Sequence, residues 1–482
     1  MKNPFVRIAD AGAVLLFASL ATAFAHTNQP ASLSTTTQSW KPSWLTEVSL
    51  GFREGFDNNV YRSGCDEKYY PGAYRSPIPG SVTALPNQGS FFDIFTPRVA
   101  VDLAKLLGDD SILQTMAFSY APDFVNYYDA ASESYVAHRL ASTIVAKYDD
   151  LTFQLDEGFT IIDGSKYGPT YPGKYYSTPG QGVLRERRDQ DQDRTTATLT
   201  YDQPTWFFRP VVSVLDDNLK TAQTNVAVAA HAGYLNYVDR ADYNVGADVG
   251  YKVATNFALT LGYRVGYQYQ EKEPHSVDAL GQSAASQYQR MLFGFEGRPV
   301  SWLKVKVQAG PDFRDYNANA PVRDRNPVVF YGDGSLTADL SKDDSISASA
   351  KRWRYASSTG MLPYDAYGFD LTYKHQFNKQ WSAKLGCNAQ SVDYSCGEVW
   401  SGAHPNPATA PTYYKNDWLF TYSAGVQYLV SASLSLDIAY AVGMERNMQD
   451  RSDLATLSGN QLPAIKREFN DQIVSLGAKY KF

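Results

Sequence analysis

The feature of this sequence that most restricts its fold is a strict two-residue alternation over unusually long segments. In residues 257–270 one face carries only large apolar or aromatic residues: Phe257, Leu259, Leu261, Tyr263, Val265, Tyr267 and Tyr269. The other face carries only small, polar or charged ones: Ala258, Thr260, Gly262, Arg264, Gly266, Gln268 and Gln270. Successive side chains of a strand point to opposite faces, so the alternation predicts a β-strand. The segment is longer than the about 9–11 residues that a strand needs to cross a bilayer.

The same alternation recurs in 303–310, 367–374 and 434–443. Strands of soluble proteins are usually only about 5–6 residues long. The polar face of these segments is rich in Gly, Ser, Thr and charge, which a packed soluble core would not accept. Apolar side chains outside and polar ones inside are typical of a barrel in lipid. We therefore expect an all-β fold, a transmembrane antiparallel up-and-down β-barrel.

The pattern predicts about 16 strands, with 14 to 18 left open. They are expected near 46–60, 91–105, 111–127, 134–148, 151–162, 193–202, 223–238, 241–253, 257–271, 286–299, 302–316, 365–377, 381–394, 416–429, 433–447 and 468–482. The segment 203–222 looks strand-like. A further crossing there would break the alternation by which successive strands run toward the outside and back toward the periplasm. We read it as a periplasmic connection. The longest expected loop, 318–364, either folds into the lumen or lies at the surface.

Aromatic residues are abundant, with 35 Tyr, 24 Phe and 8 Trp making up 14% of the chain. Such side chains form the girdles of membrane barrels at the boundary between lipid and water. The net charge is −6, and nothing in the charge pattern indicates nucleic acid as a partner.

The N-terminus has the three parts of a secretory signal. Lys2 and Arg7 precede a ten-residue apolar run, 11–20, and Ala23 and Ala25 form an A-x-A cleavage site. The apolar run is too short to span a bilayer as an uncut anchor. We expect a signal peptide at 1–25, export by the Sec route, a periplasmic segment at 26–45 and an outer-membrane barrel at 46–482.

The C-terminal strand ends in an alternating row whose members share one face: Val474, Leu476, Ala478, Tyr480 and Phe482. It resembles the terminal signal that the barrel-assembly machinery recognises in outer-membrane proteins of Gram-negative bacteria. The resemblance implies assembly by that machinery, with Leu476, Ala478, Tyr480 and Phe482 as the signal. Periplasmic chaperones, outer-membrane lipid and lipopolysaccharide are the other partners expected of such a chain.

The first mature strand ends in a polar motif that runs through Asp57, Asn58, Asn59, Val60, Tyr61 and Arg62. This motif resembles the opening of the type 2 family of β-barrel porins. The resemblance implies an outer-membrane barrel, often of unassigned substrate and sometimes encoded with exopolysaccharide export systems. A simpler reading, that Asp57 to Asn59 only form a polar turn at the strand top, stays open.

A barrel of this size can hold an aqueous channel. Its lining would comprise the polar-face residues Asp248, Lys252, Arg264, Gln268, Arg290, Glu296, Lys304, Lys306, Asp370, Lys374, Lys384, Asp437, Lys479 and Lys481. Charges along a pore set ion preference, and the basic residues on the later strands favour anions or acidic solutes. The alternative is that these charges only pair with one another and solvate the lumen.

Nothing in the sequence indicates an enzyme. It has no G-x-S-x-G, H-E-x-x-H or phosphate-loop motif, and its six histidines are scattered. We expect no catalytic residues, no metal and no cofactor. The cysteines are Cys65, Cys387 and Cys396, and a bridge between Cys65 and Cys396 is an open alternative.

The sequence therefore predicts an outer-membrane channel for passive diffusion of small hydrophilic solutes, with saccharides as candidates. Tyr-rich segments near 68–74 and 171–176 could stack on sugar rings or simply make rigid loops. The alternative is an exopolysaccharide-associated, adhesive or structural barrel without channel activity.

Overall fold

The computed structural model describes residues 41–60, 62, 88–108, 111–164, 189–220, 239–271, 283–318, 320, 322–356, 363–393, 416–447 and 469–482. The predicted signal peptide, the start of the periplasmic segment, Tyr61, Cys65 and Cys396 lie outside these ranges. Cys387 carries a free thiol. No helix within the described ranges is long and apolar enough to cross a membrane.

The described residues form one antiparallel sheet of 19 strands that closes on itself. Its strands are β1 (Leu45–Asp57), β2 (Ser90–Asp102), β3 (Leu113–Tyr120), β4 (Asp123–Tyr127), β5 (Tyr135–Tyr148), β6 (Leu151–Asp163), β7 (Gln190–Asp202), β8 (Trp206–Leu219), β9 (Arg240–Ala254), β10 (Phe257–Gln270), β11 (Ser286–Val300), β12 (Leu303–Tyr316), β13 (Val328–Asp339), β14 (Asp344–Ala356), β15 (Pro363–Gln376), β16 (Trp381–Asp393), β17 (Asn416–Leu429), β18 (Leu434–Asn447) and β19 (Phe469–Lys481). Two short 3-10 helices, Leu103–Leu106 and Ala131–Glu133, follow β2 and β4.

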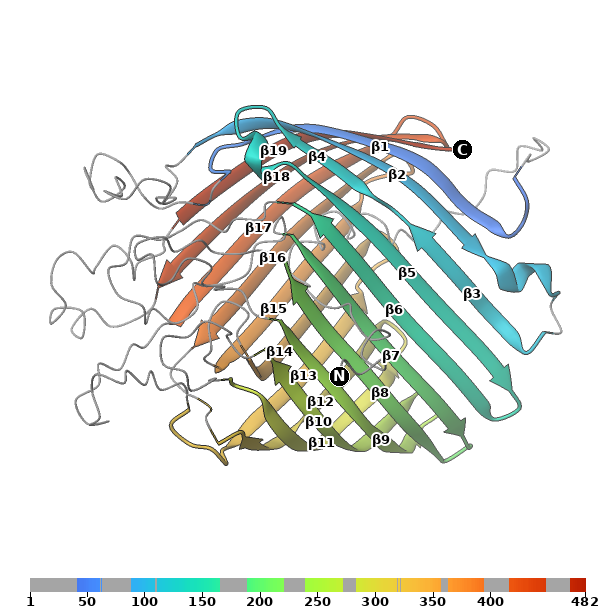
Figure 1. Ribbon diagram of the computed structural model, residues 1–482. Helices are drawn as coiled ribbons and strands as arrows, with labels where there is room; N and C mark the ends of the chain where they lie inside the picture. The colour runs from blue at the N-terminus through green and yellow to red at the C-terminus, as the bar shows by residue number, and fades with distance from the viewer. Residues whose placement is uncertain are drawn as a thin grey trace, which may run out of the picture.

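Apart from β3 and β4, each strand pairs with the next, and β1 also pairs with β19, which closes the wall (Figure 1). The strands β3 and β4 are two parts of one crossing, because both pair with β2 and β5. Pro122 lies between them and has no N–H to continue the ladder. The described wall therefore has 18 crossings, since 19 strands include one divided crossing.

Connections at one end of the barrel are short. The turn between β5 and β6 consists of Asp149 and Asp150, with Asp149 at a φ of 49°. Connections at the opposite end are mostly longer. In barrels of the outer membrane the short turns lie on the periplasmic side, so we call the two ends periplasmic and outer.

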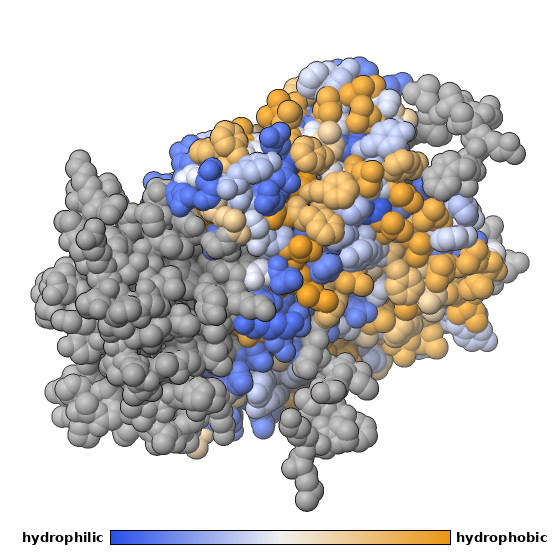
Figure 2. Space-filling model, turned by 45° about the horizontal axis from the view of Figure 1, so that its top comes forward, coloured by the Kyte–Doolittle hydropathy of each residue, from blue (hydrophilic) through white to orange (hydrophobic). Residues whose placement is uncertain are grey.

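The outer face of the barrel is apolar. On β10, Leu259 and Leu261 are each 50% exposed, whereas the intervening Thr260 is 6% exposed. Figure 2 shows such apolar residues gathered over one side of the barrel, with a band of hydrophilic residues beside them. In a closed sheet the backbone N–H and C=O groups bond to neighbouring strands. A broad apolar belt on the outside of such a sheet suits only a lipid environment. The fold is that of a Gram-negative outer-membrane β-barrel, which confirms the predicted fold class and location.

The prediction of about 16 strands is two crossings short, although 18 lies within its stated range. The segment 203–222, read as a periplasmic connection, contains the full crossing β8. The expected strand at 223–238 lies outside the described residues. β8 pairs directly with β9, so these two strands are neighbours in the wall.

The segment 318–364 was expected to be one long loop, and this is wrong. It contains β13 and β14, two full strands of the wall. They escaped the pattern because β14 alternates Ser with Ile346, Ala348 and Ala350, which gives little contrast in hydrophobicity between its faces.

The motif at the end of β1 joins the first strand to the last. The backbone N–H of Asn58 donates to the carbonyl of Gln472 at 3.0 Å. The backbone N–H of Gln472 donates in turn to the side-chain oxygen of Asn58 at 2.7 Å. Arg62 forms an ion pair with Asp471 at 3.1 Å. The polar turn that the simpler reading expected is present, since Asn59 N–H donates to Asp57 at 2.8 Å. The motif therefore both turns the chain and fastens the seam of the barrel.

Candidate functional site

The candidate site is the inner face of the barrel. All the residues that the sequence predicted as lining lie on the face opposite the apolar belt, by strand register. Four are buried: Asp248, Arg264, Gln268 and Arg290. Seven are partly exposed: Lys252, Glu296, Lys374, Lys384, Asp437, Lys479 and Lys481. Three are exposed: Lys304, Lys306 and Asp370.

The predicted assembly signal lies on the outward face. Leu476, Tyr480 and Phe482 are 59%, 46% and 47% exposed, and Ala478 is partly exposed. The backbone N–H of Phe482 donates to Val48 at 2.9 Å, so the last residue is held at the seam with β1. Its recognition by assembly machinery stays a prediction.

The outer end of β14 does not stay paired with its neighbour β13. Register between β13 and β14 ends at Gly332 opposite Arg352, whereas β14 and β15 stay paired up to Ala356 opposite Pro363. Beyond Arg352 the outer end of β14 therefore separates from β13 and turns inward together with the start of β15. The guanidinium of Arg352 fills the split by donating to the carbonyl of Phe330.

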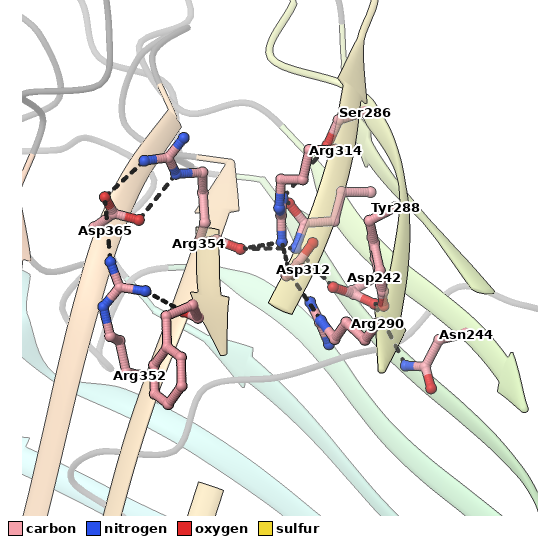
Figure 3. A network of polar contacts seen from close by, with 12 residues as sticks. Asp242, Asn244, Ser286, Tyr288, Arg290, Asp312, Arg314, Arg352, Arg354 and Asp365 are labelled. Atoms are coloured by element: carbon pink, nitrogen blue, oxygen red, sulfur yellow. Dashed lines mark hydrogen bonds and ion pairs between the residues drawn. The ribbon is translucent and has the colours of Figure 1, made fainter. Parts of the chain in front are cut away.

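Side chains from β9, β10 and β12 take over the backbone bonds that β13 no longer supplies. The carbonyl of Arg354 accepts from Gln268 Nε2 at 3.0 Å and from Arg314 Nη2 at 2.8 Å (Figure 3). Arg240 Nη1 donates to the carbonyl of Ala356 at 3.1 Å and to the hydroxyl of Tyr364 at 3.0 Å. A buried carbonyl without a partner would be costly, so these bonds hold the inward fold in place. We call the segment from Arg354 to Ala356 with its partners the constriction.

Charged and aromatic residues fill the space behind the constriction. Arg290 lies between the rings of Tyr288 and Tyr331, with its Cζ 4.0 and 4.3 Å from their centroids. Asp312 accepts from Arg290 at 2.8 Å and from Arg314 at 3.0 Å, as Figure 3 shows. Asp312 thus gives both buried guanidinium groups an opposite charge in contact, which offsets part of their loss of water.

A second ionic cluster lies nearer the periplasmic end. Arg209 bridges Asp248 at 3.0 Å and Glu296 at 2.9 Å, and Arg264 also contacts Asp248, at 2.7 Å. These contacts link four adjacent strands, β8 to β11. The alternative reading, that inner charges pair with one another, therefore describes this part of the wall.

Other inner charges stay in water. Lys304 and Lys306 on β12 are exposed although the wall around them is closed. Neither makes an ion pair within 4.0 Å among the residues that the structure describes. Both lysines are therefore open to solvent near the periplasmic end of β12.

Several residues of the constriction were missed by sequence reasoning. Asp312 and Arg314 share the face of Lys304 and Lys306 on β12, so extending the same alternation would have found them. Arg354 carries no such signal, because its segment was expected to be a loop. Its role depends on where β14 leaves β13, which no local pattern indicates.

Neither a family model nor a curated protein matches the sequence. Among solved structures, the outer membrane protein OpdK of Pseudomonas aeruginosa is similar at 8% identity, covering 90% of this chain and 99% of its own, with a TM-score of 0.39. OccK3 (OpdO) of the same organism is similar at 10% identity, covering 90% and 95%, with a TM-score of 0.37. OccAB3 of Acinetobacter baumannii is similar at 9% identity, covering 90% and 99%, with a TM-score of 0.38. Similarity this low does not identify a solute.

Proposed function

We propose that this barrel is a passive diffusion channel for small hydrophilic solutes, with saccharides among them. The observation that carries the proposal is the exposure of Lys304 and Lys306 on the inner face of a closed wall. A lysine can be inside the barrel and exposed only where water fills the lumen, and a water-filled lumen admits hydrophilic solutes. No cofactor is needed, because transport follows the solute gradient.

The constriction sets the size limit of the proposed channel. It consists of backbone and side chains held by several hydrogen bonds, so it is a fixed part of the wall. The predicted lining residues divide accordingly. Gln268 and Arg290 support the constriction, whereas Lys304, Lys306 and Asp370 face the water-filled part and act on ions by their charge.

The test is single-channel recording of the purified, refolded protein in a planar bilayer, together with swelling of liposomes in isotonic sugars. Discrete conductance steps and a swelling rate that falls with sugar size are expected. Folded protein that inserts but gives neither steps nor swelling would contradict the proposal. That outcome would favour the alternative, an adhesive, structural or exopolysaccharide-associated barrel.

A further inference from the structure

The pairing between β13 and β14 stops before either strand ends. Gly332 opposite Arg352 is the last pair, so residues 328–331 of β13 do not pair with β14. On their other side the same residues stay paired with β12, from Gly310 opposite Tyr331 to Phe313 opposite Val328. The wall therefore has a break between β13 and β14 near its outer end.

Side chains replace the backbone bonds at this break. Bonded pairs of an antiparallel ladder recur at every second residue, so the next pair would join Phe330 to Arg354. Instead, the carbonyl of Phe330 accepts from the guanidinium of Arg352. The carbonyl of Arg354 accepts from Gln268 and Arg314, which lie on other strands. No backbone ladder has to separate for the wall to open here.

The break lies within the apolar belt. On the outward face, Val328 and Phe330 of β13 are 63% and 54% exposed, and Tyr367 of β15 is 41% exposed. On the inner face, the first positions beyond the last pair are Tyr331 and Trp353. Aromatic side chains therefore border the break on the side of the lipid and on the side of the lumen.

Arg352 bridges the break on the outward face. It lies directly opposite Tyr367 in register, and its Nε donates to the Tyr367 hydroxyl at 3.1 Å. Its ion pair among the described residues is a long one, to Asp365 at 4.0 Å. Moving this one side chain would open the wall, whereas between strands that stay paired, such as β15 and β16, a row of backbone bonds would have to break first.

We propose that the break between β13 and β14 is a lateral portal, through which small uncharged aromatic molecules pass from the lumen into the outer leaflet. The solute is uncharged because it ends in hydrocarbon, where a charge is costly. It is aromatic because the rings of Phe330, Tyr331 and Trp353 can stack on it along the way. The portal goes beyond the proposed channel, whose aqueous path serves hydrophilic solutes.

The first test asks whether lipid reaches the inner face at the break. In protein with Cys65, Cys387 and Cys396 changed to Ser, a bimane fluorophore is attached to Val329→Cys, on the inner face beside the break. Ser335→Cys is the matched control, on the same strand and face where β13 and β14 stay paired. Lipids brominated along their acyl chains are expected to quench bimane at position 329 and not at 335. Equal quenching at both, whether present or absent, would overturn the portal.

The second test measures passage with N-phenylnaphthylamine, an uncharged aromatic dye that fluoresces in membranes. Arg352→Ala should speed its entry into the outer membrane of intact cells by about fivefold, since one lost hydrogen bond shifts an equilibrium by about that factor. Arg446→Ala is the control, because Arg446 lies on β18 where that strand stays paired with β17. A rate that Arg352→Ala leaves unchanged, or that both variants raise equally, would overturn the portal.

Heat-modifiable migration on gels checks that each variant is folded, and planar-bilayer recording is made on the same samples. Conductance steps without quenching at position 329 would overturn the portal and leave the channel standing. Quenching at position 329 in a protein without conductance steps would overturn the channel and leave the portal standing.

Discussion

Arg314 on β12 donates to the backbone carbonyl of Arg354 on β14 at 2.8 Å, reaching past the intervening strand β13. The contact exists because β14 separates from β13 beyond Arg352. The same guanidinium contacts Asp312 at 3.0 Å and Gln268 at 2.6 Å. The buried side chain of Arg314 therefore both neutralises Asp312 and fixes the position of the constriction.

Replacing Arg314 with Met is expected to loosen the constriction. It removes one of the two donors to the Arg354 carbonyl and leaves Asp312 with Arg290 alone. Because a buried charge loses a partner, the free energy of unfolding should fall by about 3–5 kcal/mol. Single-channel conductance should rise, since the inward fold of β14 is less restrained.

The matched control for this prediction is Arg298→Met. Arg298 is an exposed arginine at the periplasmic end of β11, and its side chain donates only to the carbonyl of Ser301 among the residues that the structure describes. Urea unfolding in lipid vesicles and bilayer recording measure both quantities. Equal conductance and stability in the two variants would show that Arg314 does not hold the constriction.

Replacing glycine with alanine is expected to have opposite effects on stability at Gly266 and at Gly158. A Cβ on Gly266 would lie 2.2 Å from Cζ of Tyr288, which crosses directly over it and is fully buried. Gly266→Ala should therefore displace Tyr288, break its hydrogen bond to Asp242 and lower the free energy of unfolding by about 1–3 kcal/mol.

A Cβ on Gly158 of β6 meets no atom within 4 Å. Gly158→Ala should be neutral or stabilise the barrel by about 0.5–1 kcal/mol, because alanine loses less backbone entropy than glycine in a strand. Urea titrations of both variants compare them directly. Equal stability of the two would mean that Tyr288 does not need the space above Gly266.

Lys304 and Lys306 should set part of the ion preference. Changing both to Glu turns two positive charges in the water-filled lumen into two negative ones. The reversal potential under a KCl gradient should shift toward that of a cation-preferring channel, with conductance steps preserved. Lowering the salt concentration should enlarge the shift, because screening weakens. An unchanged reversal potential would remove both lysines from the ion path.

The ion pair of Arg62 and Asp471 should stabilise the seam between β1 and β19. Arg62→Gln and Asp471→Asn each remove one charge and keep a polar side chain. Each should lower the free energy of unfolding by about 1.5–3 kcal/mol, as expected for hydrogen bonds to charged groups. The double variant should cost less than the sum of the two, because both remove the same contact.

Heat-modifiable migration on gels and urea unfolding measure this coupling. Additive losses would place the importance of the motif elsewhere, for instance in the exchange between Asn58 and Gln472.

Much of the wall could be predicted from local pattern. The strand expected at 257–271 appears as β10, one residue shorter, since its two faces differ strongly in hydrophobicity. The pattern failed where that contrast is weak, as in β14 with its alternating Ser and Ala. The prediction also failed at β8. The apolar residues Trp206 and Phe208 indicated a strand there, but we read the segment as a connection to keep the alternating direction of the strands.

The sequence by itself determined that this chain is a closed barrel with its apolar face outward, because most strands carry their own two-residue period and lipid accepts no open edge. It also placed Lys304 and Lys306 on the inner face. Only the tertiary structure decided where β14 leaves β13 and bonds to side chains of β9, β10 and β12. Gln268 and Arg354 are 86 residues apart in sequence, and they meet because β14 leaves its neighbour and needs new hydrogen-bond donors. Such a contact follows from the path of the backbone across the barrel, which no periodicity along one strand encodes.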